Sequence, residues 1–95
     1  MKASYRLSGK AAEDLFDLYR YGVRSFGLDR ANRYYDSLVK RLEEIGNDPL
    51  RFPLTEYREG YRRSVHAPHA IYFRLGEDGT VEIIRILRGQ DPRQL

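Results

Sequence analysis

Two amphipathic helical patterns, separated by a link of two or three residues, constrain this chain more than any other feature of its sequence. The first pattern begins after Ser8, a residue type favoured as a helix N-cap, and ends at Gly27. The second begins after Asp29, another candidate N-cap, and ends at Gly46. Helices joined by so short a link pack antiparallel, so the sequence predicts a helical hairpin. The apolar stripes are Ala12, Leu15, Phe16, Tyr19, Val23 and Phe26 in the first helix, and Ala31, Tyr34, Tyr35, Leu38, Leu42 and Ile45 in the second.

Strand patterns flank this hairpin on both sides. They cover residues 3–7, 61–67, 69–75 and 80–87. Residues 50–60 show no clear period and are interpreted as a loop, and residues 76–79 as a hairpin turn. We therefore expect one α+β domain over residues 1–95 with the order β-α-α-β-β-β. The helical hairpin should pack on one face of a mostly antiparallel sheet.

Composition narrows the class of protein. The chain has 95 residues and no cysteine, which excludes a disulfide scaffold and a cysteine-based metal site. No stretch reaches the about 18 apolar residues of a membrane span, and the first residues lack the apolar region of a signal peptide, so we expect none. These features predict a cytoplasmic protein. Fourteen of the seventeen cations are arginine, a residue enriched with tyrosine at protein interfaces, although a high-GC genome or a nucleic-acid partner would give the same excess.

The chain carries more apolar surface than its predicted fold can cover. Residues 81–87 place apolar side chains on both faces of the last strand, whereas one helix pair covers a single face. Leu18, Tyr21 and Leu28 fall outside the main stripe of the first helix. The surplus predicts an interface with a partner. The alternative is that sheet twist and the C-terminal tail cover it.

Taken in order, several segments resemble the RelE/ParE superfamily of toxins, and the ParE type more than the RelE type. These segments are residues 5–8, 14–15, 19–21, 26–27, 31, 33–34, 38, 47–49, 60–62, 69–74 and 84–91. Two positions depart from the family pattern. Gly9 stands where members often have proline, and Arg88 stands where many have histidine.

The resemblance implies the toxin of a bacterial type II toxin–antitoxin system, with no cofactor. Such a toxin is expected to inhibit DNA gyrase without being an enzyme. It would be neutralised in a hetero-oligomer by a ParD-like antitoxin that has a ribbon-helix-helix N-terminus and an acidic helical tail.

Two sets of residues are candidates for these contacts. The apolar surface of the first helix and the sheet, together with arginines that suit acidic partners, predicts an antitoxin surface formed by Leu15, Leu18, Tyr21, Leu28, Arg74, Ile83 and Arg85. No apolar period follows Leu87, so the tail should add little to the core. Because the resemblance nevertheless continues through the tail, the tail is expected to contact the target. The residues expected to carry toxicity are Arg62, Arg85, Arg88, Gly89, Asp91 and Arg93.

Two other functions remain open. A ribosome-dependent mRNA ribonuclease of the RelE type would need proton-transfer groups beside its cations, yet residues 90–95 contain no tyrosine, histidine or lysine. His69 is interpreted as a structural hydrogen-bonding residue and His66 as a strand residue, and no third ligand supports a metal site. We therefore predict no catalytic residues. The third possibility is a toxin-fold protein that serves only as a binding partner or corepressor.

Overall fold

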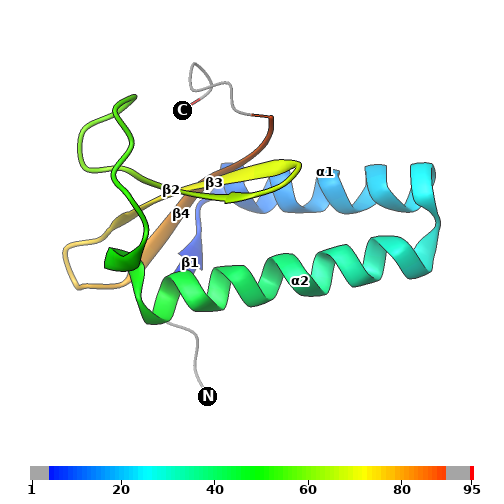
Figure 1. The fold of residues 1–95 in the computed structure, drawn as a ribbon, viewed down its shortest axis with the longest axis horizontal. Helices are drawn as coiled ribbons and strands as arrows, with labels where there is room; N and C mark the ends of the chain where they lie inside the picture. The colour runs from blue at the N-terminus through cyan, green and yellow to red at the C-terminus, as the bar shows by residue number, and fades with distance from the viewer. Residues whose placement is uncertain (1–4, 90–94) are drawn as a thin grey trace.

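The computed structural model describes residues 5–89 and residue 95. Its two helices lie side by side against a four-stranded sheet (Figure 1). The elements are β1 (Tyr5–Leu7), α1 (Gly9–Phe26), α2 (Leu28–Asn47), the short 3-10 helix η1 (Pro49–Arg51), β2 (Arg62–His66), β3 (His69–Leu75) and β4 (Val81–Arg88). The predicted class and element order are confirmed. None of the described helices is long and apolar enough to cross a membrane.

The sheet has the strand order β1-β4-β3-β2. The pairs β2–β3 and β3–β4 are antiparallel, as their short turns require, and β1 pairs with β4 in parallel. The parallel pair is possible because the whole helical hairpin lies between β1 and the later strands in the sequence. The hairpin therefore covers one face of the sheet, as predicted.

Ser8 lies between β1 and α1 and forms hydrogen bonds both to α1 and to β4. Its side chain accepts from the backbone N–H of Ala11 at 3.0 Å, which confirms it as the N-cap. Its hydroxyl donates to the carbonyl of Ile84 at 2.8 Å, and its backbone N–H donates to the carbonyl of Ile83 at 2.9 Å. The start of α1 is thereby fixed to the edge of β4 just beyond the end of β1.

The turn between the helices is tighter than predicted. Gly27 alone separates them, with a φ of 90° that favours glycine. The second helix begins at Leu28, so Asp29 is not its N-cap and lies instead in its first turn. There its carboxylate complements the positive end of the helix dipole.

The main core lies between the hairpin and the sheet. It consists of Ala11, Leu38, Leu42, Ile45, Ile71, Phe73, Val81, Ile83 and Ile86. The predicted stripe of α1 is partly wrong: Ala11 is buried rather than Ala12, and Phe16 and Phe26 are 61% and 51% exposed. Phe26 stands at the far end of the hairpin, which extends past the β2–β3 turn and has no sheet to pack against there (Figure 1). Phe16 lies earlier in α1, in a surface hollow shared with Leu7 of β1, and is exposed because it faces away from the core.

A β-bulge explains why β4 appeared apolar on both faces. Tyr72 pairs with Arg85 but Phe73 pairs with Ile83, so β4 has one extra residue at this point. The bulge lets Ile83 and Ile86 both join the core under the helices. Ile83 is fully buried there, which corrects its assignment to an antitoxin surface.

The outer face of the sheet carries a second, smaller cluster formed by Ala70, Tyr72 and Leu87. The side chain of Leu95 packs against this cluster and is itself partly buried. The tail was expected to add little to the core, and Leu95 is the described residue through which it adds to this smaller cluster. A residue from the tail covers part of the apolar surplus, as the alternative interpretation proposed.

Candidate functional site

An apolar hollow opens between the far half of the hairpin and the β2–β3 turn. Its volume is ≈ 260 Å³. The walls come from Leu18, Tyr21 and Phe26 of α1, Tyr34 of α2, and Pro68 of the turn, with Arg30 and Arg88 also lining it. We call it the hairpin hollow. It exists because the hairpin extends beyond the sheet, which leaves these apolar side chains without a layer to cover them.

Two arginines of the hollow stack on aromatic side chains. The guanidinium of Arg30 lies 4.8 Å from the ring centre of Phe26, and that of Arg88 lies 5.3 Å from the ring centre of Tyr21. Stacking leaves the edges of a guanidinium open to bidentate pairing with a carboxylate. The hollow therefore combines an apolar interior with cations suited to an acidic segment.

Tyr34 joins the β2–β3 turn to α2 beside the hollow. Its hydroxyl lies 3.0 Å from the carbonyl of His66 and 2.7 Å from Nδ1 of His69. Because a carbonyl only accepts, both contacts are satisfied when Tyr34 donates to His66 and the Nδ1–H of His69 donates to Tyr34. Ser37 adds a contact of 3.1 Å to Nε2 of His66. The structural hydrogen bond predicted for His69 is confirmed, and His66 has a partner that the sequence did not reveal.

Burial keeps the side chains of Tyr34, His66 and His69 uncharged at neutral pH. It raises the pKa of Tyr34 to about 12, against a smaller opposing effect of Arg88. It lowers the pKa of His69 to about 4, with Arg88 and His66 adding to the effect. It also lowers the pKa of His66, with a contribution from Arg41. A neutral His69 beside a protonated phenol forms a structural contact rather than an acid–base pair.

Acidification is expected to destabilise the protein through His69. Its pKa is lowered on folding from 6.5 to about 4, so the stabilisation is complete above about pH 6.5 and is lost as the pH falls towards 4. When the pH is lowered from 7.5 to 4.5, the change at His69 alone should reduce the free energy of unfolding by about 2–3 kcal/mol. Urea denaturation at both pH values measures it. A His69→Gln variant, which cannot be charged, should show a loss smaller by that amount, and equal losses would contradict the assignment.

The arginine of β4 expected to contact a partner is engaged within the chain. Nε and Nη2 of Arg85 donate to the two carboxylate oxygens of Asp14 at 2.7 and 2.9 Å. The side chains are 18% and 14% exposed. Asp14 also accepts a hydrogen bond from the backbone N–H of Ile86 at 2.9 Å. It thereby provides a partner for a backbone N–H at the edge of β4, beyond the part that β1 covers. These bonds raise the pKa of Arg85 and correct the expectation that its guanidinium is open to a partner's carboxylate.

The other predicted cations are held in separate places. Arg74 donates to Glu82 at 2.8 Å, and Arg6 donates to the other oxygen of Glu82 at 2.6 Å. Arg62 donates to the carbonyl of Phe52 at 2.6 Å. Arg6 and Arg74 therefore share one carboxylate, whereas Arg62 is bonded to a backbone carbonyl. No group of three metal-ligating side chains occurs among the described residues.

The two predicted surfaces are therefore brought together only in part. The structure places Leu18 and Tyr21 in the hollow, together with Arg88 from the toxicity set. Leu28 is 58% exposed at the end of the hairpin, and Leu15 is partly buried against the core. Gly89 follows β4, and its N–H donates to the carbonyl of Pro68 at 2.9 Å. Two other residues of the set, Asp91 and Arg93, lie outside the described residues.

Several residues that line the hollow were not predicted as site residues, among them Phe26, Arg30, Tyr34 and Pro68. Phe26 and Tyr34 were interpreted as core residues because they continue helical stripes. The missing information was the length of the sheet beneath the hairpin, which no pattern in the helices encodes.

Comparisons with known proteins agree on one family. The family model described as ParE toxin of type II toxin–antitoxin system, parDE, matches residues 5–92. Toxin ParE1 of Caulobacter vibrioides is 37% identical over 84 residues, which are 87% of this chain and 85% of the relative. Toxin ParE1 of Mycobacterium tuberculosis is 26% identical over 88 residues, which are 92% of this chain and 90% of the relative.

Two solved structures share the fold. The first is described as a chromosomal ParDE TA system from P. aeruginosa and superposes with a TM-score of 0.80 at 23% identity, covering 93% of this chain and 97% of that one. The second is described as the toxin–antitoxin complex RelBE2 from Mycobacterium tuberculosis. It gives a TM-score of 0.66 at 19% identity and covers 93% of this chain and 99% of that one.

Proposed function

Because the chain belongs to the ParE toxin family of type II toxin–antitoxin systems, we propose that it inhibits DNA gyrase in the bacterial cytoplasm and is neutralised when a ParD-like antitoxin occupies the hairpin hollow. The observation that carries the proposal is the family match over residues 5–92. The antitoxin would form a hetero-oligomer with the toxin through a helical acidic segment that follows a ribbon-helix-helix N-terminus.

The hollow suits such a segment in shape and in charge. An amphipathic helix binds by placing apolar side chains in a groove, and aromatic and arginine side chains carry most of the energy at such interfaces. Tyr21 and Phe26 provide apolar contact area and are 48% and 51% exposed. Arg30 and Arg88 line the hollow, where their guanidinium groups can pair with the carboxylates of an acidic segment.

A ribonuclease of the RelE type is not favoured by the geometry. Cleavage would need a base, an acid and several cations around one phosphate. Here Arg74 and Arg85 are bonded to Glu82 and Asp14, and His69 is buried against Tyr34. A non-toxic binding partner could also use the hollow, so only a toxicity assay separates that possibility from the toxin.

The decisive experiment compares two purified targets. We expect the protein to inhibit supercoiling by gyrase holoenzyme and to leave mRNA on ribosomes uncut. Addition of the antitoxin encoded beside the toxin should restore supercoiling. Codon-specific mRNA cleavage that is abolished by His69→Ala would instead establish the ribonuclease. Absence of both activities together with no growth inhibition would leave the binding partner as the function.

A further inference from the structure

The positive charge of the chain is concentrated at the far end of the hairpin. Residues 19–33 contain four arginines and one aspartate, a net charge of +3 that equals the formal net charge of the whole chain. The other parts of the chain therefore carry equal numbers of cations and anions. A potential concentrated in this way steers an oppositely charged partner to one end of the molecule.

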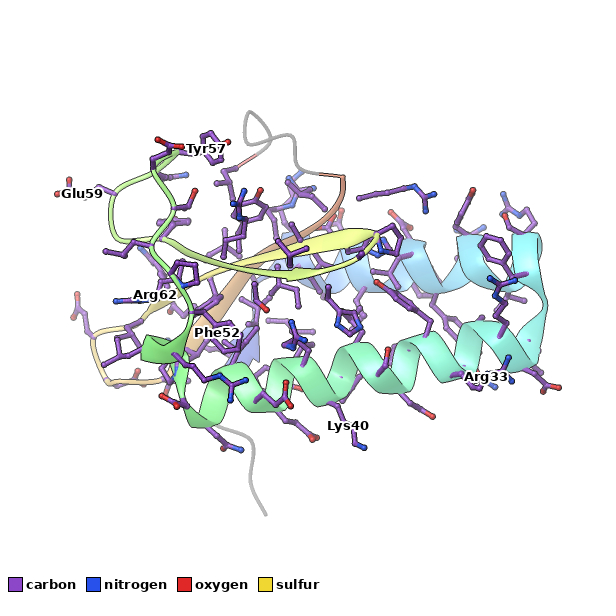
Figure 2. All side chains as sticks on the ribbon, in the orientation of Figure 1. Arg33, Lys40, Phe52, Tyr57, Glu59 and Arg62 are labelled. Atoms are coloured by element: carbon purple, nitrogen blue, oxygen red, sulfur yellow. The ribbon has the colours of Figure 1, made fainter. Side chains whose placement is uncertain are left out.

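These four arginines lie on exposed turns of both helices. Arg20 and Arg24 are four residues apart on α1, and Arg30 and Arg33 are three apart on α2, so each pair shares one helix face. The single-residue link at Gly27 brings the ends of the helices together. Figure 2 shows Arg33 near this end of α2, well away from the sheet.

Exposed apolar side chains accompany the arginines. Phe16, Phe26 and Leu28 are between 51% and 61% exposed. The guanidinium of Arg20 lies 5.5 Å from the ring centre of Phe16, as that of Arg30 lies over Phe26. Cations and apolar groups are therefore interleaved over this end of the hairpin, a composition typical of protein interfaces.

The arginines at this end differ from four others, which are paired within the chain. Arg6, Arg41, Arg74 and Arg85 each pair with a carboxylate of the chain. Within the part of the chain that the structure describes, none of the four arginines at positions 20, 24, 30 and 33 forms such a pair. Four exposed guanidinium groups without an intramolecular acid favour an acidic partner by charge complementarity.

We propose that this end of the hairpin, formed by Phe16, Arg20, Arg24, Phe26, Leu28 and Arg33, docks onto an acidic protein surface of the target that the toxin inhibits. The inference rests on the proposed toxin function and places target recognition on the hairpin end rather than on the C-terminal tail. A protein partner is favoured over nucleic acid because interfaces with nucleic acid are more polar than interfaces between proteins, and this surface includes the exposed side chains of Phe16, Phe26 and Leu28. Phe26 belongs to both the hollow and the hairpin end, so an antitoxin in the hollow would also obstruct the target.

The test reverses charge at the hairpin end outside the hollow. Arg24 and Arg33 do not line the hollow and are both exposed, so R24E/R33E should fold normally and bind antitoxin within about threefold of the wild type. We expect its inhibition of gyrase supercoiling and its inhibition of growth to fall at least about 30-fold. The matched control K10E/K40E makes the same change in net charge at exposed lysines elsewhere and should remain fully active (Figure 2 shows Lys40).

The other outcomes can be distinguished from one another. Full activity of R24E/R33E would exclude the hairpin end, and equal loss in K10E/K40E would show an effect of net charge alone. Binding of a labelled 30-base-pair duplex without gyrase, lost only in R24E/R33E, would assign the surface to nucleic acid. If the wild type inhibits growth but not gyrase, the gyrase proposal fails while the growth assay still tests the surface. A wild type without any toxicity removes both proposals.

Discussion

Replacing Tyr21 with alanine is expected to weaken the antitoxin complex about 30- to 1,000-fold, a loss of about 2–4 kcal/mol typical of a central aromatic contact. Tyr21 lines the hollow, is 48% exposed and carries the guanidinium of Arg88 over its ring. The substitution therefore removes an apolar contact and the surface that orients an arginine. Because the ring is half exposed, the fold of the free protein should change little.

Tyr57 provides the matched control. It is 49% exposed, and it stands on the loop before β2 at the opposite end of the molecule from the hairpin end (Figure 2). Tyr57→Ala should therefore bind antitoxin like the wild type. Titration calorimetry of both variants measures the difference. If the two variants bind equally, the antitoxin does not use the hollow, although the family assignment would stand.

Replacing Asp14 with alanine is expected to destabilise the free protein by about 2–4 kcal/mol, because a partly buried arginine and an edge N–H both lose their acceptor. Asp14 accepts two hydrogen bonds from Arg85 and one from the backbone of Ile86. A domain of this size has a total stability of roughly 5–14 kcal/mol, so the loss is a large share of it. The melting temperature should fall by roughly 10–25 °C.

The neighbouring Asp17 makes the comparison specific. It is exposed on the same helix, so Asp17→Ala should change the melting temperature by only a few degrees. Thermal unfolding followed by circular dichroism measures both variants. A small effect of Asp14→Ala would mean that Arg85 contributes little inside the chain, and Arg85 would again be a candidate for contact with a partner.

The sequence was sufficient to predict the layers of the fold. Ser8 and Gly27 marked the limits of the first helix, Gly46 stood one residue before the end of the second, and the short link required an antiparallel hairpin. The strand predicted at residues 69–75 agrees with β3 (His69–Leu75) at both ends. These features depend on local backbone preferences and on periodic burial, which neighbouring residues carry by themselves.

The candidate site could be predicted only in part. Leu18 and Tyr21 were found because they stand off the main apolar stripe of α1. No sequence pattern indicated that Arg85 pairs with Asp14, because these residues are far apart in the chain and meet only when α1 packs along the edge of β4. Ile83 was misplaced for a similar reason: the bulge that turns it towards the core depends on the pairing of β3 with β4.

By itself, then, the sequence determined the order of the elements, the hairpin and the family resemblance, since each follows from neighbouring residues or from an ordered set of short segments. Only the tertiary structure decided which apolar residues stay exposed and which cations are already paired. The hairpin is longer than the sheet that it covers, and this difference in length leaves Tyr21 and Phe26 at the surface. Exposure depends on the relative reach of two packed layers, and no single segment of the chain contains that information.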